Sequence, residues 1–274
     1  MSNETLSSRK IALVTGASAG IGAEFAKQLA AQNFNLVITA RRMQRLEALA
    51  NELRSEYDTK VLCLAADLAE PSAVQTLIDT LDEHQLTIHT LINNAGYGVP
   101  GHLTAVEWQQ HQDFMQVMVN SVIELCYRLL PATQAQQAGQ IINVASLAGI
   151  VPSSASHTLY AASKAFLIKL SEALALENEP LGIKVQALCP GFTYSEFHDV
   201  LGMREQVSKM PGYMWMSAES VVSESLRETA KPNGKIMLIS GPVNRFIARL
   251  SHWLPQKTAV NMVKRRSKQY RAQE

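Results

Sequence analysis

Long apolar runs are missing from this chain of 274 residues. A transmembrane helix needs roughly 20 mostly apolar residues, and no stretch reaches that length, so the sequence predicts no membrane-spanning segment. The first ten residues are polar and lack the apolar centre of a secretory signal. Together, these absences favour a cytoplasmic location.

Cysteine is scarce as well. The chain has three cysteines, and Cys63, Cys126 and Cys189 are far apart in the sequence. Their spacing matches neither a metal-binding motif nor a disulfide framework. Cys63 and Cys189 lie in apolar, strand-like runs, so we expect reduced cysteines in the core and no bound metal.

A strong excess of charge of one sign is also missing. The formal net charge is +1, which gives the whole molecule no electrostatic bias toward nucleic acid. Apolar residues make up 47% of the chain and charged residues 18%, which are ordinary values for a globular protein. We therefore expect a small-molecule partner and no nucleic-acid partner.

Short apolar runs alternate with longer amphipathic ones along most of the chain. Such alternation predicts an α/β fold, a Rossmann-like doubly wound parallel sheet of about seven strands with helices on both faces. No linker interrupts it, so we expect one domain over residues 9–241, followed by a helical extension over 242–274. The expected strands cover 11–15, 36–39, 61–64, 88–92, 140–144, 183–188 and 234–239. The expected helices cover 20–32, about 42–57, a segment from about 71, about 104–130, a segment ending near 178, and about 217–229.

A glycine-rich turn joins the first expected strand to the first expected helix. Glycines at such a turn allow the backbone to approach a pyrophosphate, and the helix N-terminus offers free N–H groups to it. Without its context, the glycine trio could be an ordinary turn. The position between strand and helix favours a dinucleotide site instead. The residues expected to line it are Gly16, Ser18, Ala19, Gly20, Ile21 and Gly22.

The second expected strand ends without an acidic residue. An acid there would bond the ribose 2′-hydroxyl of NAD, whereas arginine there accommodates the 2′-phosphate of NADP. This chain has Arg41 and Arg42 at that point. The sequence therefore predicts NADP (NADPH) as the cofactor, the alternative being that both arginines simply open a solvated helix.

Tyr160 and Lys164 are four residues apart in an expected helix, which places them on one face. An ammonium beside a phenol favours the phenolate and lowers the phenol pKa. A tyrosine adjusted in this way can exchange a proton with an alcohol or a ketone. Taken without the glycine turn, the same pair could be a solvated helix face.

These residues resemble the short-chain dehydrogenase/reductase family in its single-domain form, over about residues 9–240. The resemblance is carried by motifs in the family's order. They are Thr15-Gly16-x-x-x-Gly20-Ile21-Gly22, Asp67, Asn93-Asn94-Ala95-Gly96, Asn120, Ser146, Tyr160-x-x-x-Lys164 and Pro190-Gly191.

The resemblance implies four catalytic residues. Tyr160 is expected to be the general acid/base, and Lys164 to lower its pKa and bond the nicotinamide ribose. Ser146 is expected to hydrogen-bond the substrate oxygen as a preorganised donor. Asn120 is expected to hold a water that links Lys164 to solvent.

The resemblance also adds residues to the cofactor site. The family often has a threonine after Pro-Gly that contacts the nicotinamide carboxamide. Here Ser195 stands at the matching position and Thr193 two residues earlier. The interval from Ser146 to Tyr160 is also at the long side of the family's range. The full set of added residues is Asp67, Leu68, Asn94, Ala95, Gly96, Tyr160, Lys164, Pro190, Gly191, Thr193 and Ser195.

The segment after Pro190-Gly191 is apolar and rich in methionine, which adapts to irregular shapes. We therefore expect an NADP-dependent oxidoreductase acting on a hydrophobic ketone, aldehyde or 3-oxoacyl-type substrate. One alternative is a catalytically silent regulatory protein that binds a dinucleotide on the same fold. Another is a membrane-associated, lipid-metabolising reductase. The expected pocket residues are Phe192, Tyr194, Phe197, Val200, Leu201, Met203, Met210, Tyr213, Met214, Trp215 and Met216, the alternative being that they pack in the core of a lid helix. His157 and Tyr97 could reach the pocket as well, but ordinary loop residues are the favoured interpretation of these two.

The end of the chain is amphipathic and then basic. Residues 246–254 are followed by Pro255 and by six Lys or Arg residues from Lys257 to Arg271. A subunit contact or a solvated tail is the favoured interpretation, and contact with an anionic membrane surface is the alternative. The resemblance also implies a homodimer or homotetramer formed through the helices expected at 104–130 and 157–178.

Overall fold

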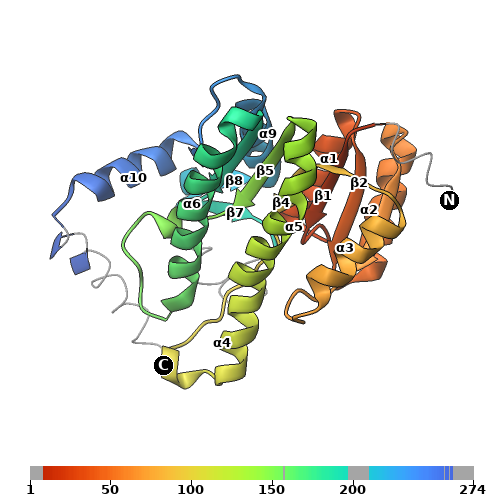
Figure 1. The fold of residues 1–274 in the computed structure, drawn as a ribbon. Coiled ribbons are helices and arrows are strands. Elements are labelled where there is room, and N and C mark those ends of the chain that lie inside the picture. Colours follow the sequence, from red (N-terminus) through yellow and green to blue (C-terminus); the bar gives the residue numbers. More distant parts are fainter. Residues whose placement is uncertain (1–8, 157, 197–209, 256, 259, 262–274) are drawn as a thin grey trace.

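A parallel sheet of seven strands forms the centre of the molecule, in the order β3-β2-β1-β4-β5-β6-β9 (Figure 1). The structure is a computed structural model, and it describes residues 9–156, 158–196, 210–255, 257–258 and 260–261. The predicted seven-stranded, Rossmann-like sheet is confirmed. The strands are β1 (Ile11–Thr15), β2 (Asn35–Ala40), β3 (Val61–Ala65), β4 (Ile88–Asn93), β5 (Gly139–Val144), β6 (Ile183–Cys189) and β9 (Met237–Ile239).

Helices cover both faces of this sheet, which explains why its central strands are apolar throughout. On one face, the core residues of the helices α1 (Gly20–Ala31), α2 (Met43–Tyr57) and α9 (Ala218–Ala230) pack in one apolar cluster. On the other face, α3 (Ala73–Glu83), α5 (Ser121–Gln136) and α6 (Thr158–Asn178) pack in a second cluster.

The strand order reverses between β1 and β4, which are neighbours in the sheet. The connection after β1 runs toward one face and the connection after β4 toward the other. In open parallel sheets this divergence leaves a crevice beyond the carboxyl ends of the strands, where ligands bind. The topology therefore fixes where a site can form before any side chain is considered.

The helix expected over 104–130 is divided into several pieces. A 3₁₀ turn at Leu103–Ala105 is followed by α4 (Trp108–Met115), a π-helical turn at Gln116–Asn120, and then α5. A π turn inserts one extra residue into a helix and is often found at functional sites. The hydrophobic period of the sequence continues across it, so the pattern alone predicted one helix.

Two short strands were not predicted. β7 (Phe192–Tyr194) and β8 (Trp215–Ser217) pair in parallel as a separate two-stranded sheet. The rings of Tyr194 and Trp215 stack across this pair with centroids 4.8 Å apart. Three-residue strands separated by more than 20 positions carry no periodic signal, so only the tertiary structure brings them together.

The helix α10 (Pro242–Trp253) follows β9 and lies beyond the edge of the sheet at the left of Figure 1. Its N-terminal proline suits the first helical turn, and Pro255 follows its end. Among the described residues, no helix is long and apolar enough to cross a membrane.

The close packing of Gly22 gives a test of the fold. A Cβ atom at Gly22 would overlap the Gly16 carbonyl and the Asn94 amide, whereas a Cβ at Gly212 would meet nothing within 4 Å. Gly22→Ala is therefore expected to lower the free energy of unfolding by about 1–3 kcal/mol, the usual range for overpacking. Gly212→Ala is the matched control and should change it little. Urea denaturation measures both, and equal stability of the two variants would contradict the packing argument.

Candidate active site

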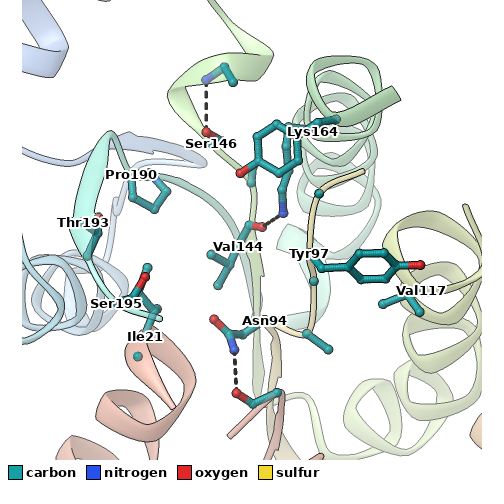
Figure 2. A pocket seen from close by; sticks show the side chains of 18 of the residues that line it. Ile21, Asn94, Tyr97, Val117, Val144, Ser146, Lys164, Pro190, Thr193 and Ser195 are labelled. Carbon is teal, nitrogen blue, oxygen red and sulfur yellow. Dashed lines mark hydrogen bonds between the residues drawn. The ribbon is translucent and has the colours of Figure 1, made fainter. Parts of the chain in front are cut away.

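A cavity of about 1100 Å³ opens beyond the carboxyl ends of the strands (Figure 2). Residues directly after β2, β3, β4, β5 and β6 all contribute to its wall. Of the residues predicted to be catalytic or to bind the cofactor, all line this cavity except two. Gly22 lies behind the wall, in the packing described above, and Asn120 lies elsewhere.

Hydrogen bonds from Asn94 to the chain at the end of β1 hold the glycine turn in place. The Asn94 amide donates to the carbonyl oxygens of Thr15, at 2.9 Å, and Gly16, at 3.2 Å (Figure 2). The Thr15 hydroxyl accepts the backbone N–H groups of Asn94 and Ala95, each at 3.0 Å. Gly16 has a φ of 65° and a Cβ there would lie 2.8 Å from the Cα of Ala95. Glycine is therefore required at this position on two counts.

The N-terminus of α1 faces the same cavity. Its N-cap residue, Ala19, provides no side-chain hydrogen bond, and Ala19, Gly20 and Ile21 all line the cavity wall. Unsatisfied N–H groups and the positive end of the helix dipole favour an anionic group at such a point.

A cluster of charged side chains lies at the end of β2. Arg42 donates to the Ser18 hydroxyl at 3.1 Å and to the Glu196 carboxylate at 3.3 Å. Arg45 donates to both oxygens of the same carboxylate, at 2.7 and 2.6 Å. These two guanidinium groups, Arg45 first, lower the pKa of Glu196. Arg41 lines the cavity beside them.

Sequence reasoning missed Arg45 and Glu196. Arg45 is three residues after Arg42 on one helix, a spacing that could have pointed to it. Glu196 is far away in sequence, and no local pattern connects it to α2. Of the two arginines expected to receive a phosphate, Arg42 holds a carboxylate in this structure together with Arg45, and Arg41 lines the cavity.

Ser146, Tyr160 and Lys164 come together at the other end of the cavity. Ser146 follows β5, and its hydroxyl accepts the backbone N–H of Ala148 at 3.1 Å (Figure 2). Lys164 is buried, and its ammonium donates to the Val144 carbonyl at 2.7 Å. The Lys164 Nζ atom lies 5.7 Å from the centre of the Tyr160 ring. The sequence interval between Ser146 and Tyr160 therefore did not prevent the three from meeting.

The electrostatics of this cluster differ from the sequence expectation. Burial raises the pKa of Tyr160 to about 12, and a hydrogen bond with Ser146 acts in the opposite direction. Burial also lowers the pKa of Lys164 to about 8. The expected lowering of the phenol pKa by Lys164 is absent in this state, because the ammonium is directed to the Val144 carbonyl and burial dominates.

Asn120 is not brought into the cavity. It ends the π-helical turn before α5, is exposed, and donates from its amide to the Gln116 side chain at 2.9 Å. The cavity wall on this side is formed by Asp113 and Val117, from α4 and the π turn. The extra residue of the turn changes which side chains of this helix face inward.

The remaining predicted cofactor residues line the cavity as a group. Asp67 is exposed and its carboxylate accepts the backbone N–H of Ala69 at 3.1 Å. The Thr193 hydroxyl donates to the Gly191 carbonyl at 3.2 Å. The other members lining the wall are Leu68, Ala95, Gly96, Pro190 and Ser195.

Part of the expected apolar pocket is also in place. Phe192, Met210 and Met214 line the cavity, and Tyr97 does so with its phenol turned toward Val117 (Figure 2). The tyrosine and tryptophan of the β7–β8 pair, together with Tyr213 and Met216, are not part of the wall. The predicted pocket residues His157, Phe197, Val200, Leu201 and Met203 lie outside the described residues.

The helix α10 contributes to the cavity, which was not predicted. Asn244 and Ile247 line the wall, and a Cβ at Gly191 would overlap the Asn244 amide. The extension after residue 241 therefore packs directly on the Pro190-Gly191 turn. The amphipathic pattern of α10 was visible in the sequence. The surface that its inner face covers was not.

The cysteines are free thiols, and burial raises the pKa of Cys126 and of Cys189 to about 12. Within the described ranges, no group of three His, Cys, Asp or Glu side chains is placed to hold a metal ion.

Comparison with known proteins places this site in a family. A sequence model described as short chain dehydrogenase matches residues 10–206. The chain is 30% identical over 181 residues to a 7beta-hydroxysteroid dehydrogenase of Collinsella aerofaciens, covering 66% of this chain and 68% of that protein.

Solved structures agree in fold. A short-chain dehydrogenase from Sphingobium yanoikuyae in complex with NADPH has a TM-score of 0.78 and 30% identity, with 90% of this chain and 96% of that chain covered. A short chain dehydrogenase/reductase from Burkholderia phymatum in complex with NAD has a TM-score of 0.78 and 25% identity, with 89% and 93% covered. The family match over most of the chain, with this fold, makes the protein a member of the short-chain dehydrogenase/reductase family of oxidoreductases.

Proposed function

We propose that this protein is an NADP-dependent reductase or dehydrogenase that interconverts a hydrophobic carbonyl compound and its alcohol. The observation that carries the proposal is the meeting of Ser146, Tyr160 and Lys164 with the glycine turn on the wall of one cavity. A proton-exchanging group and a dinucleotide cradle are the two parts that this reaction needs.

The cavity fits a dinucleotide on physical grounds. The Gly16 turn leaves no room for a Cβ, and the α1 N-terminus beside it has no side-chain cap. Together these features form a concave surface of backbone donors suited to a pyrophosphate. Asp67 and Leu68 would hold the adenine, and Ala95 and Gly96 the adjoining ribose.

The preference for NADP rests on the charged cluster at the end of β2. Arg42 and Arg45 converge on the single carboxylate of Glu196, and Arg42 also donates to the Ser18 hydroxyl. An arginine pair that binds a carboxylate in this way also has the geometry to bind a phosphate. The last residues of β2 and the two that follow it, Thr39-Ala40-Arg41-Arg42, include no acid that could bond a free 2′-hydroxyl.

A bound nicotinamide would supply or accept the hydride at the carbonyl carbon of the substrate. In the reductive direction the Tyr160 hydroxyl donates a proton to the carbonyl oxygen. A pKa near 12 keeps that hydroxyl protonated at neutral pH. The Ser146 hydroxyl hydrogen-bonds the same oxygen and stabilises the negative charge that develops on it.

The buried ammonium of Lys164 has two functions in this proposal. Its positive charge near the Tyr160 ring favours the phenolate that remains after proton transfer. Its hydrogen bond to the Val144 carbonyl fixes its position next to the cavity. The Asn120 amide is bonded to the Gln116 side chain outside the cavity. Asn120 can hold the water of a proton relay only if this hydrogen bond opens.

The substrate class follows from the apolar part of the cavity wall. Phe192, Met210, Met214 and Ile247 provide an apolar surface that adapts to varied shapes. The Collinsella relative is named for a hydroxysteroid, which is a hydrophobic alcohol of this kind. We propose a ketone, an aldehyde or a 3-oxoacyl compound with a large apolar part.

Homo-oligomer formation through α5 and α6 is also part of the proposal. Large apolar side chains are exposed on both helices, among them Tyr127, Phe166 and Leu176. Exposed apolar surface of this kind is typical of subunit contacts.

The alternative function is a regulatory protein that binds a dinucleotide without turnover. The two are separated by following NADPH and NADH oxidation against ketones, aldehydes and 3-oxoacyl thioesters. NADPH-dependent turnover supports the enzyme, and tight NADPH binding without turnover across the panel supports the regulator.

Tyr160→Phe removes the hydroxyl that donates the proton and keeps the ring. We expect kcat for carbonyl reduction to fall about 10²–10⁴-fold, the usual contribution of general acid catalysis. NADPH affinity, measured by fluorescence titration, should remain within about twofold, since the ring stays in place. A variant with unchanged kcat would remove Tyr160 from the proton-donor role.

Arg42→Ala/Arg45→Ala removes both guanidinium groups of the charged cluster. We expect NADPH to bind about 10–100-fold more weakly, as for lost hydrogen bonds to a charged group, and NADH to be affected little. Glu196→Gln is the control with the opposite expected effect. Its neutral amide competes less than the carboxylate with the cofactor phosphate for the arginines, so NADPH should bind several-fold more tightly. Calorimetry with both cofactors measures these changes. Equal effects on NADPH and NADH would show that the cluster does not contact the 2′-phosphate.

The pKa of Lys164 predicts a pH dependence. The value of about 8 means that the ammonium is present below that pH and lost above it, while Tyr160 stays protonated up to about 12. The kcat/KM for NADPH reports ionisations of the free enzyme and should be level below about pH 8 and fall about tenfold per pH unit above it. Lys164→Met should give a low, flat profile. A decline that begins only near pH 10, the ordinary lysine range, would contradict the lowered pKa.

A further inference from the structure

Positive charge is concentrated in the last sixth of this nearly neutral chain. Residues 229–273 contain no Asp or Glu, and the preceding residues hold almost all the acidic side chains of the protein. Ten of the chain's 25 Lys and Arg residues fall in this short segment. They are Lys231, Lys235, Arg245, Arg249, Lys257, Lys264, Arg265, Arg266, Lys268 and Arg271. The net charge of +1 is therefore the sum of a strongly basic C-terminal segment and an acidic remainder of the chain.

The outer face of α10 carries a stripe of large apolar side chains. Phe246 is 65% exposed, Leu250 44% and Trp253 83%, and their spacing of four and three residues places them on one side of the helix. Arg249 is exposed on the same side. We call Phe246, Arg249, Leu250 and Trp253 the outer stripe.

The inner face of α10 fixes the helix to the body of the protein. Asn244 and Ala248 are buried, and the Asn244 amide donates to the Ser240 carbonyl at 2.7 Å. Arg245 forms an ion pair with Glu224 at 2.6 Å. The outer stripe is therefore presented by an anchored helix, at the outer edge of the molecule (Figure 1).

We propose that the outer stripe of α10 docks on an anionic lipid surface. A helix with aromatic and aliphatic side chains on one side and cations beside them lies in the membrane interface with its apolar side buried. Tryptophan is favoured at that depth, since its ring is apolar and its N–H is polar. The basic residues that follow in the sequence add attraction to anionic headgroups, about 1 kcal/mol for each cation near the surface.

Charge also argues against the main competing occupant, a second copy of the same stripe. A two-fold contact through α10 would bring two basic segments together, and like charges at close range oppose association. A nucleic acid would match the charge, but duplex backbones present no apolar surface to Phe246, Leu250 and Trp253. A bilayer interface satisfies both the charge and the apolar stripe.

The two faces of α10 connect this surface with the cavity. Ile247 lines the cavity wall while its neighbour Phe246 points outward. Docking would bring the cavity close to the lipid phase, which suits a bilayer-dissolved substrate. This last consequence rests on the proposed hydrophobic substrate, whereas the docking itself does not.

Vesicle flotation of the full chain tests the proposal without measuring enzyme activity, so its failure is distinct from failure of the proposed function. The protein is expected to float with vesicles that contain phosphatidylglycerol and to stay in solution with pure phosphatidylcholine. Raised salt should weaken the binding, since the attraction between cations and headgroups is screened. Absence of flotation with the anionic vesicles overturns the proposal.

The matched variants are Trp253→Ser and Trp108→Ser. Both replace an exposed tryptophan and keep the charge, but Trp108 lies on α4, 69% exposed and away from the outer stripe. Trp253→Ser should bind anionic vesicles about tenfold more weakly, from the lost apolar burial, and Trp108→Ser should bind as the unmodified protein does. Equal loss in both variants overturns the assignment to α10.

Light scattering after size exclusion tests the remaining candidate for the outer stripe, a second copy of the same chain. If Trp253→Ser lowers the molecular mass in solution and leaves vesicle binding unchanged, a second copy covers the stripe and the lipid proposal is overturned. If the mass is unchanged and vesicle binding falls, the lipid proposal is supported.

Discussion

The hydrogen bonds between Thr15, Gly16 and Asn94 hold the ends of two neighbouring strands together at the point where the strand order reverses. Thr15 and Gly16 follow β1, Asn94 follows β4, and the connections leaving those strands run to opposite faces. The same bonds shape the glycine turn and orient the start of α1 toward the cavity. A side chain on Gly16 or Gly22 would separate these elements, so the position of the α1 N-terminus depends on the absence of two Cβ atoms.

Burial governs the chemistry at the opposite end of the cavity. The same desolvation raises the pKa of Tyr160 and lowers that of Lys164, because burial disfavours the charged form of each group. The Val144 carbonyl accepts the Lys164 ammonium and limits its influence on the phenol. A protonated tyrosine suits donation of a proton to a carbonyl oxygen. The charge of the lysine then matters most after the transfer, when the phenolate needs a counter-charge.

Two segments that look peripheral in the sequence shape the surface around this site. Glu196, after β7, occupies the arginines of α2, so the state described here already neutralises the cations that favour a phosphate. The helix α10 closes another part of the wall with Ile247 and turns its outer stripe to solvent. The charged cluster proposed to select the cofactor and the helix proposed to dock on lipid therefore form two different parts of the same cavity wall.

The sequence by itself determined the order and type of most elements, the parallel sheet, and a set of catalytic and cofactor-binding residues of which nearly all line the cavity. Local signals were sufficient there, because a buried parallel strand is apolar throughout and a glycine turn or a Tyr–Lys pair on one helix face is written in consecutive residues. The tertiary structure alone decided the π turn that leaves Asn120 outside the cavity, the β7–β8 pair, the contact of Glu196 with Arg42 and Arg45, and the direction of the Lys164 ammonium. Each of these depends on groups far apart in the chain or on a competition between burial and hydrogen bonding, which no local pattern encodes.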